Sequence, residues 1–383
     1  MKKTNKLFYV TAALAVICLI LLCLLLTRKN SITVRTGSGN EITCSVEEAE
    51  KMANMMVSSS RSFLTDSLFR GQKLYVIGHK SPDLDTVGSA IAYARLLNSL
   101  GCDAEPRITM SPNAQTRFAL KYCGIPVPEI LDDAGGQNIV LVDISNDVNT
   151  VDNIYEANVV GILDHHAHNL NTSRPILLEI EPTGAAQTIV GLSYLKNGVI
   201  PDEQTAKLMA LTILSDTSGL AHDDVTEADR NMLSWTAEIG KVNVEEMIPK
   251  LAEAAYDYTG MTDSDIYYND YKLYVAGNDE FRYMIGIGKT KSKEEMQDLA
   301  LRLQTVINQE YKEKGLDMMI AQIYPEDHSA QYLAVAGPDA DYILQGALGD
   351  MVTLDEETGL YYSEESFSRK TVISPKINEF VLK

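Results

Sequence analysis

Cysteine is too sparse and too scattered in this sequence to build a disulfide framework or a thiolate metal site. The chain has 383 residues and only five cysteines. Cys18 and Cys23 lie in an apolar N-terminal stretch, and the other three are far apart (Cys44, Cys102 and Cys123). No C-x-x-C spacing occurs, so neither a zinc knuckle nor a set of disulfides is indicated. Unpaired cysteines favour a reducing compartment such as the cytoplasm.

Basic residues and tryptophan are also scarce. The chain has 33 Lys and Arg against 53 Asp and Glu, a net charge of −20, and one Trp. A surface this acidic repels nucleic acid, which excludes a polyanion-binding scaffold and any nucleic-acid partner. No aromatic-rich segment lies beside the motifs described below, so no platform for a nucleobase is indicated. A small anion would bind only where metal ions or a local basic cluster reverse the field.

The N-terminus carries an uncharged run that is long enough to cross a bilayer. Leu7–Leu26 has no charged residue over twenty positions, which is the length of a membrane-spanning helix. Leu21 and Leu22 stand directly before Cys23, which argues against a lipoprotein cleavage site there. We therefore expect residues 1–30 to be an uncleaved anchor in the cell membrane. Basic residues flank both ends and leave the orientation open, and only the cysteine usage favours the cytoplasmic side.

The pattern that follows the anchor predicts an α/β domain. Residues 31–70 are expected to be a juxtamembrane connector with a short helix, because Ser45 and Glu48 have capping-box spacing. From Lys73 onwards, apolar runs alternate with helical segments. The expected strands cover residues 73–78, 138–144, 158–166 and 176–182, and the expected helices residues 90–100, 185–195, 203–216 and 244–256. Near-continuous apolar strands of this kind predict a doubly wound, mainly parallel sheet over residues 71–256.

A second, smaller α/β domain is expected at the C-terminal end, over residues 266–383. Residues 257–265 are rich in Gly and Asp and are predicted to be a linker. Beyond it, strands are expected at residues 270–277, 281–290, 317–325 and 331–337, with a helix around residues 293–312. A length of about a hundred residues is usual for a domain.

Carboxylates and imidazoles gather where the predicted parallel strands end. In chain order they are His79, Asp83 and Asp85 after the first strand, Asp143 in the second, Asp164, His165 and His166 in the third, and Asp216 at the end of a helix. Each residue alone has a structural explanation, such as a turn or a helix terminus. Their convergence favours function, because ligands of α/β enzymes bind at the carboxyl ends of parallel strands.

Mixed Asp and His ligands without thiolates indicate the kind of metal. They suit Mn²⁺, Mg²⁺ or Co²⁺ better than structural zinc. Six or more ligands are too many for one metal ion that must keep a position open. Two ions bridged by carboxylates fit the number of ligands and imply an activated water that attacks phosphorus.

Taken in order, these motifs resemble those of the DHH phosphoesterase superfamily. The matching stretches are "HKSPDLD" (79–85), "VD" (142–143), "DHH" (164–166) and "SDT" (215–217). Within the superfamily, "EIEPTGAAQTI" (179–189) and "SRKTVISP" (368–375) resemble segments of the manganese-dependent, family II inorganic pyrophosphatases. The resemblance covers residues 72–383 and implies hydrolysis of pyrophosphate between two domains.

The resemblance also implies a role for each matching residue. One metal ion would be held by His79, Asp83, Asp143 and Asp216, and the second by Asp85, Asp143, His165 and Asp216, so that Asp143 and Asp216 bridge. His166 would contact substrate and take part in catalysis with the two bridging aspartates. Lys272, Arg369 and Lys370 would bind the phosphate, and these cations supply the reversal of charge that the acidic chain requires.

Two segments depart from the pattern of the family and leave alternatives open. Ser145 and Asn146 follow Ile144 where the family usually carries His-Asn, and "SGLAHDDVTEAD" (218–229) replaces a Phe-Lys-Ser-Pro stretch. The alternative enzyme is therefore an exopolyphosphatase-like enzyme acting on short polyphosphate, or another phosphoesterase of the DHH superfamily. A non-catalytic anion sensor at the membrane is the alternative from another class. A homodimer is compatible with the sequence, which fixes no oligomeric state.

Overall fold

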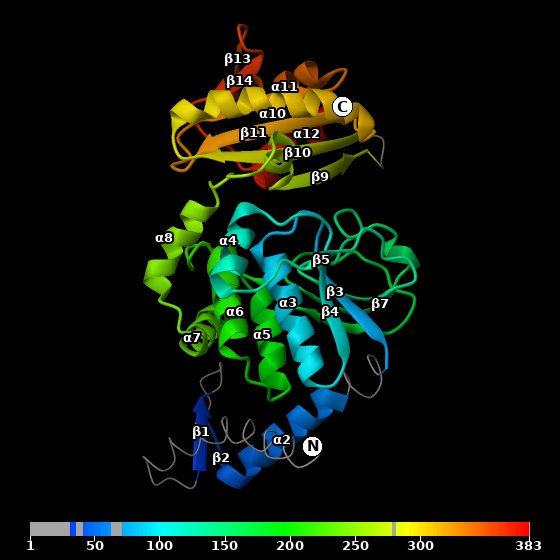
Figure 1. Ribbon diagram of the computed structural model, residues 1–383, viewed down its shortest axis with the longest axis vertical. Coiled ribbons are helices and arrows are strands. Elements are labelled where there is room, and N and C mark those ends of the chain that lie inside the picture. The colour runs from blue at the N-terminus through cyan, green and yellow to red at the C-terminus, as the bar shows by residue number, and fades with distance from the viewer. Residues whose placement is uncertain (1–30, 36–40, 63–70, 278–280, 383) are drawn as a thin grey trace.

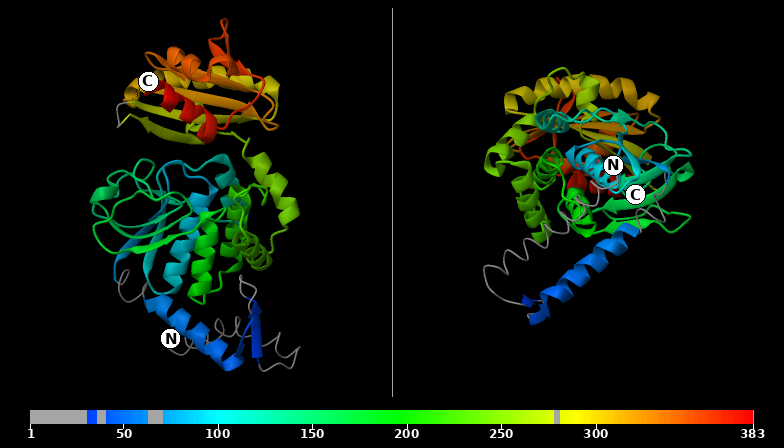
Figure 2. Two further views of the ribbon diagram at one scale, coloured as in Figure 1. Left: turned by 180° about the vertical axis from the view of Figure 1, so that it is seen from behind. Right: turned by 60° about the horizontal axis from the view of Figure 1, so that its bottom comes forward.

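The computed structural model describes residues 31–35, 41–62, 71–277 and 281–382. These residues contain a two-stranded sheet and two six-stranded sheets. We call the part around the sheet β3–β8 the first lobe (residues 73–254) and the part around the sheet β9–β14 the second lobe (residues 258–382). Figures 1 and 2 show the lobes one above the other, joined by the segment that follows α8.

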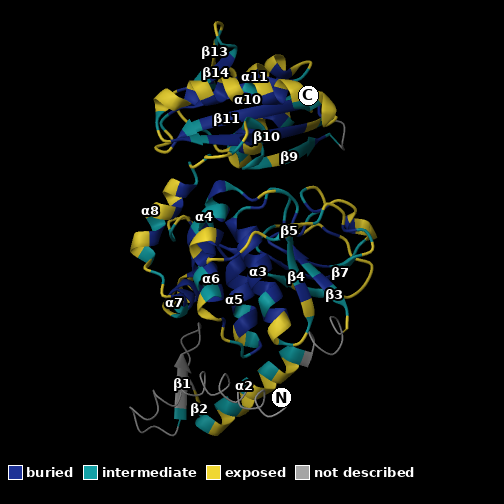
Figure 3. Ribbon diagram, viewed as in Figure 1, coloured by how far each residue is buried: buried dark blue, intermediate teal, exposed yellow. Residues whose placement is uncertain are grey.

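The first lobe is built on a parallel sheet. Its strands are β3 (Lys73–Ile77), β4 (Asp103–Ile108), β5 (Glu129–Ile130), β6 (Asn138–Val142), β7 (Asn158–Asp164) and β8 (Leu177–Ile180). They pair in parallel in the order β5-β4-β3-β6-β7-β8. The central strands are almost wholly buried, as the dark ribbons of Figure 3 show, because they are covered on both faces. The predicted mainly parallel sheet is confirmed.

Helices cover one face of this sheet. They are α3 (Leu84–Ser99), α4 (Ala114–Cys123), α5 (Ala186–Lys196), α6 (Glu203–Asp216), α7 (Glu227–Gly240) and α8 (Val244–Ala254). Side chains of α3 and α5 pack directly on the sheet, and α6, α7 and α8 form a layer behind them. The other face is covered by irregular segments that include Ile144, Val151 and Leu170 and by one 3₁₀ turn, Ile154–Glu156. Helices on both faces, as a doubly wound fold would have, are therefore not found in this lobe.

A close approach of α3 and α6 determines the shape of the candidate site. A Cβ atom on Gly88 would lie 2.1 Å from Thr212 Oγ1, so no larger residue fits between these helices. Asp85 lies one turn before Gly88 on α3, and Asp216 lies one turn after Thr212 on α6. Glycine at this position thus brings two carboxylates from distant parts of the sequence together.

The second lobe has a mixed sheet with helices on both faces. Its strands are β9 (Tyr271–Ala276), β10 (Phe281–Thr290), β11 (Met318–Pro325), β12 (Gln331–Ala336), β13 (Thr353–Asp355) and β14 (Leu360–Ser363), in the order β13-β14-β12-β11-β10-β9. Its helices are α9 (Asp263–Tyr268), α10 (Lys293–Glu313), α11 (Ala340–Leu348) and α12 (Ser374–Val381). Only β10 and β11 pair in parallel. The predicted strands and the helix at 293–312 are confirmed.

The described N-terminal part consists of β1 (Ser31–Arg35), β2 (Glu41–Ser45) and α2 (Val46–Ser62). The predicted capping box is present, since Ser45 Oγ accepts from the Glu48 N–H at 3.2 Å and Glu48 Oε2 accepts from the Ser45 N–H at 2.8 Å. Arg61 Nε at the other end of α2 donates to the Asn197 carbonyl at 2.9 Å. The helix expected in the connector is therefore attached to the first lobe.

The expected membrane anchor requires a correction. Within the described part of the chain, no helix combines the length and the apolar character needed to cross a bilayer. This finding contradicts the single-pass, cell-membrane location expected from the sequence. The segment on which that expectation depended, Leu7–Leu26, lies outside the described residues. The prediction depended on hydropathy and on the lack of a cleavage pattern, and no contact among the described residues supports it.

Candidate metal centre

The candidate ligands meet at one edge of the parallel sheet. Strands β3, β6 and β7 are parallel neighbours, so their carboxyl ends open on the same side. Three groups of side chains have ligand atoms within 4.8 Å of one another: His79 with Asp83 and Asp143, Asp85 with His165 and Asp216, and Asp143 with His165 and His166. All six residues predicted as metal ligands, and His166, are thus brought together.

Asp143 lies at the centre of the site in an unusual backbone conformation. Its φ is +58°, a left-handed value that Asp tolerates better than most residues. The side chain is 2% exposed, and Thr86 Oγ1 donates to its Oδ2 at 2.7 Å. The Nε2 atoms of His79 and His165 lie 3.3 Å from Oδ2 and Oδ1 respectively. The strained turn after β6 therefore points one carboxylate between two imidazoles.

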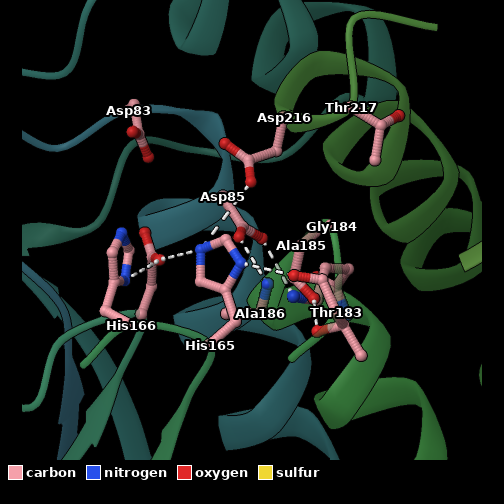
Figure 4. Close-up of polar contacts among 12 residues, drawn as sticks. Asp83, Asp85, His165, His166, Thr183, Gly184, Ala185, Ala186, Asp216 and Thr217 are labelled. Carbon is pink, nitrogen blue, oxygen red and sulfur yellow. Dashed lines mark hydrogen bonds and ion pairs between the residues drawn. The ribbon is translucent and has the colours of Figure 1, made fainter. Parts of the chain in front are cut away.

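Asp85 is held by the start of helix α5. Its Oδ2 accepts from the Ala186 N–H at 2.6 Å and its Oδ1 from the Gln187 N–H at 2.9 Å. These are free amides of the first helical turn, where the helix dipole favours negative charge. Figure 4 shows Asp85, Asp216 and Asp83 directed toward the same space, with His165 beside them. The segment "EPTGAAQT" thus orients a carboxylate of another helix.

The hydrogen bonding of His165 determines which of its nitrogens faces the carboxylates. Its Nδ1 lies 2.9 Å from the Thr183 carbonyl oxygen, which can only accept, so Nδ1 carries the proton. The Nε2 atom then lies 3.3 Å from Asp143 Oδ1 and 3.8 Å from Asp216 Oδ2. A neutral imidazole would direct a lone pair at two anionic oxygens. That arrangement is stable with a proton or a metal cation between them, as in carboxylate–histidine metal sites.

Asp164 orients both histidines of the "DHH" motif. Its Oδ1 accepts from the backbone N–H groups of His165 at 2.8 Å and His166 at 3.2 Å, and lies 2.9 Å from His166 Nδ1. The Asp164 side chain is completely buried. Because Nδ1 of His166 donates to this carboxylate, Nε2 is left for another partner.

The pKa values show how strongly this cluster attracts positive charge. Burial alone would lower the pKa of His79, but the charge of Asp83 and the hydrogen bond to Asp143 outweigh it and raise the pKa to about 10. Burial alone would also lower the pKa of His165. The hydrogen bond to Asp143 and the charge of Asp143 outweigh burial and raise this pKa to about 11. Burial and repulsion from Asp143 and Asp83 raise the pKa of Asp216 to about 8. Protons collect here because several carboxylates face one another.

A pair of divalent cations fits this donor set. When all four are deprotonated, Asp83, Asp85, Asp143 and Asp216 carry four negative charges, which two divalent ions neutralise. The residues offer only carboxylate oxygens and imidazole nitrogens, the donors that manganese accepts. Two of the ligand groups described above, one around His79 and one around His165, offer separate positions for two ions.

The predicted phosphate-binding residues fall into two neighbouring cavities. His166 and Lys272 line a cavity of about 50 Å³ together with His79 and Asp143. Arg369 and Lys370 line a second cavity of about 360 Å³, which shares Lys272 with the first. Lys272 therefore joins the candidate metal centre to the other two cations. Among the described residues, no hydrogen bond or ion pair joins Arg369 or Lys370 to a candidate metal ligand.

Arg369 is fixed within the second lobe. Its Nη2 lies 2.8 Å from Asp270 Oδ1, and its Nη1 donates to the carbonyl oxygens of Asp270 and Ile285, both at 3.1 Å. Burial of Asp270 is outweighed by the charges of Arg369 and Lys289, and its pKa is lowered to about 2. Lys370, in contrast, is exposed and makes no hydrogen bond or ion pair with any residue the structure describes.

Several residues that shape the site were not predicted from the sequence. Asp229 is completely buried, and its carboxylate accepts from the Gly184 N–H at 2.9 Å and from Thr188 Oγ1 at 2.6 Å. It thereby fixes the loop whose Thr183 carbonyl orients His165. Thr226 and Asp229 form a capping box at the start of α7, and this spacing was the available signal. Asn146 and Asn149 line the 50 Å³ cavity; the sequence marked Asn146 only as a departure from the family pattern, and no motif identified Asn149.

Comparison with known proteins defines first the class to which this site belongs. Residues 73–228 match the profile of the DHH family, N-terminal domain. The matched segment runs from β3 to the start of α7 and contains all of the candidate metal ligands. The parallel sheet with its strand-end ligands is therefore that of a DHH-family protein.

Relatives that align over most of the chain show to which group of DHH-family proteins it belongs. A manganese-dependent inorganic pyrophosphatase of Methanothrix thermoacetophila is 31% identical over 312 residues, which cover 79% of this chain and 97% of that protein. The enzyme of the same name from Bacillus subtilis is 30% identical over 314 residues, covering 80% and 98%. A solved structure from Methanococcus jannaschii, assigned to the family II inorganic pyrophosphatases, aligns with a TM-score of 0.67 at 25% identity, covering 81% of this chain and all of that one. The chain belongs to the manganese-dependent inorganic pyrophosphatase family.

Proposed function

We propose that this protein hydrolyses inorganic pyrophosphate to two phosphates with two manganese ions held at the edge of the first sheet. The observation that carries the proposal is the convergence of four carboxylates and two imidazoles on one point, in a chain whose relatives of similar length are manganese-dependent pyrophosphatases. Mg²⁺ and Co²⁺ suit the same oxygen and nitrogen donors.

The two ions would share two bridging aspartates, Asp143 and Asp216. His79 and Asp83 would complete one site, and Asp85 and His165 the other. Manganese bound here supplies a Lewis acid that neutralises phosphate charge and activates a water molecule. The chain supplies the fixed orientation: the Thr183 carbonyl determines which nitrogen of His165 is free, and Asp164 does the same for His166. His166 would then present Nε2 to a phosphate oxygen of the substrate.

The second phosphate group would be bound by cations from the second lobe. Lys272 borders the candidate metal centre directly, and Arg369 and Lys370 lie beyond it around the adjoining cavity. Arg offers a planar fork and Lys a point charge to phosphate oxygens. We assign residues 71–256 as the metal-binding catalytic domain and residues 266–383 as the substrate-binding domain, with the substrate bound between them. The homodimer that is compatible with the sequence stays a prediction, which sedimentation analysis can test.

The part of the site beside the candidate metal ligands is small, which favours an inorganic phosphate group over a nucleobase there. The cavity that joins the candidate ligands to Lys272 measures about 50 Å³, whereas pockets for larger organic ligands span about 300–1,000 Å³. One aromatic side chain, Tyr271, lines it. Short polyphosphate is the alternative substrate, because the segment after Asp216 differs from the pattern of the family and stands at the end of a candidate ligand helix.

A phosphate-release assay with Mn²⁺ tests the proposal. We expect kcat/KM for pyrophosphate to exceed that for tripolyphosphate and for cyclic dinucleotides at matched metal concentration. A higher value for tripolyphosphate would support the exopolyphosphatase-like alternative. Absence of turnover with every substrate, in protein shown to bind two manganese ions, would favour the non-catalytic sensor.

A further inference from the structure

A cavity lined by cations lies on the side of the molecule where the chain passes between the lobes. It measures about 540 Å³ and is bordered by α4, α8, the segment 256–259 and the turn after β10. In Figure 1, α8 runs up to this connection beside α4. The basic residues that line the cavity are Arg117 and Lys121 of α4, Lys250 of α8 and Lys291 of the second lobe. The acidic residues that line it are Glu253 and Asp257. It shares no lining residue with either cavity of the candidate metal centre.

The charge of this cavity opposes that of the chain. Four cations face two carboxylates in a protein whose net charge is −20. Among the described residues, the side chains of Arg117 and Lys121 have no hydrogen-bond or ion-pair partner, although the charge of Arg117 acts on Asp257 and Asp265. Lys250 pairs with Glu246 at 2.5 Å and Lys291 with Glu253 at 3.2 Å, and exposed pairs of this kind contribute little and are readily exchanged. Two cations are thus available for a ligand, and two more become available when they exchange partners.

We propose that this cavity is a second anion site, which binds a ligand carrying two or three linked phosphate groups. The four cations come from three separate segments of the chain, so several linked phosphate groups can contact more of them than a single phosphate can. Arg117 offers the fork geometry that phosphate oxygens accept, and the lysines offer point charges around it. The volume lies within the range of small-molecule sites. The ligand is either an inorganic polyphosphate or the phosphate chain of a nucleotide.

The position of the cavity connects such a ligand to both lobes. Arg117, Lys121 and Lys250 belong to the first lobe and Lys291 to the second. The neighbouring Gln115 Nε2 donates to the Leu251 carbonyl at 2.9 Å, and the Ala114 N–H donates to Asn269 Oδ1 at 2.9 Å. A bound phosphate chain therefore bridges the two lobes at the point where α4, α8 and the start of the second lobe already touch.

Titration calorimetry on the full chain tests this proposal. Metal ions are first removed with EDTA and dialysis, so that the carboxylate cluster of the candidate metal centre repels anions. Tripolyphosphate and ATP are then titrated in separate experiments. We expect one site per chain, and charge reversal in the double variant R117E/K121E should weaken binding at least about tenfold because phosphate contacts are mainly electrostatic.

The double variant R282E/K376E is the matched control, because both of its side chains are exposed and lie outside the cavity. It makes the same change in net charge and should alter affinity less than about twofold at physiological salt. Equal weakening by both double variants, or no binding by the wild-type chain, would overturn the proposal. If R117E/K121E does not fold, R117Q/K121Q removes the charges at similar size. If ATP binds more tightly than tripolyphosphate, the ligand is the phosphate chain of a nucleotide. If the two bind equally, the ligand is an inorganic polyphosphate.

Discussion

At the scale of single residues, the candidate metal centre depends on carboxylates that repel one another. Asp85 and Asp143 are buried, and each is held in place by donors from other segments: amides of α5 for Asp85 and Thr86 for Asp143. Asp216 has no such donor among the described residues, and its raised pKa reflects burial and the charges around it. Asp216 is therefore the carboxylate that depends most on bound cations.

The substitution Asp216→Asn should lower manganese content from two ions per chain to one or fewer. The amide keeps the shape of the side chain but loses the charge that would bridge the ions, so kcat should fall by about a thousandfold or more. Metal analysis of dialysed protein and a phosphate-release assay measure both effects. Asp224→Asn removes the same charge from the exposed loop nearby and should change neither. Two bound ions and normal turnover in the Asp216 variant would contradict the assignment.

A pH effect is expected from Asp270, which lies outside the candidate metal centre. Its folded pKa of about 2 is below the ordinary value because of Arg369 and Lys289. A folded-state pKa below the unfolded-state pKa stabilises the folded protein at pH values above the unfolded-state pKa. This stabilisation is lost as the pH falls through the folded-state pKa. The difference in unfolding free energy between wild type and Asp270→Asn should therefore be constant from pH 7 to about pH 5 and shrink between about pH 4 and 2.

Denaturant titrations across this pH range measure that difference. The same substitution in an Arg369→Ala background should lose most of its pH dependence, because the guanidinium is the main charge that holds the Asp270 pKa down. A pH dependence that persists unchanged in that background would show that another group lowers the pKa.

The sequence predicted the ligands of this site better than the residues that orient them. His79, Asp143 and His165 could be found because the carboxyl ends of parallel strands meet at one edge, and apolar runs identify those strands. Asp229 and the Thr183 carbonyl act through hydrogen bonds to segments about 20 to 45 positions away. Nothing in local composition specifies such partners. Their roles became visible only when the loop, α5 and α7 were seen together.

At the scale of elements, most strands rich in apolar residues were predicted, whereas β14 and the charged strand β4 were not. The strand β4, "DAEPRI", carries three charged residues and a proline, and it forms a strand because β3 and β5 pair with it on either side. The 3₁₀ turn and loops on the second face of the sheet were likewise not predicted, since apolar residues such as Val151 and Leu170 lie there without periodic spacing. Tertiary contacts outweigh local propensity in these segments.

The short π-helical turn Arg369–Ile373 contains two cations with different surroundings. Arg369 connects this turn to β10 and to the residue before β9 through Asp270 and Ile285. Arg369→Ala should lower the unfolding free energy by about 2 kcal/mol, because it leaves the Asp270 carboxylate without its partner, and should also raise KM and lower kcat. Lys370→Ala should affect KM and kcat without changing Tm.

Thermal unfolding, metal analysis and steady-state kinetics on the two variants separate these effects. Both proteins should keep two manganese ions per chain, since neither residue belongs to the proposed ligand set. Loss of metal from either variant would show that the second lobe contributes to the ion sites. An unchanged Tm for Arg369→Ala would show that the contacts of its guanidinium add nothing to stability.

At the scale of the whole molecule, the proposed substrate contacts come from both lobes, His166 from the first and three cations from the second. Lys272 borders the candidate ligands, while Arg369 and Lys370 line the adjoining cavity. A pyrophosphate bound to the metal ions would be enclosed fully only if the second lobe moved toward the first. Such closure would exclude water from the site and complete the set of cations around the substrate.

Small-angle X-ray scattering can measure this closure. Manganese together with a non-hydrolysable pyrophosphate analogue should reduce the radius of gyration of the wild-type chain, and manganese alone should reduce it less. Lys370→Ala should show a smaller reduction at the same analogue concentration, because one of the cations that attract the second phosphate is missing. An unchanged radius in the saturated wild-type complex would show that the arrangement in Figure 1 is already the active one.

Within the described residues, the chain passes from the first lobe to the second only once, between Ala254 at the end of α8 and Asp263 at the start of α9. No strand of one lobe enters the sheet of the other. A gene recombination event with its breakpoint in this segment would therefore cut no sheet and no helix. It would exchange one complete second lobe for another and leave the strand-end ligands intact. The substrate of such a protein could change in a single genetic step, while its metal chemistry was inherited unaltered.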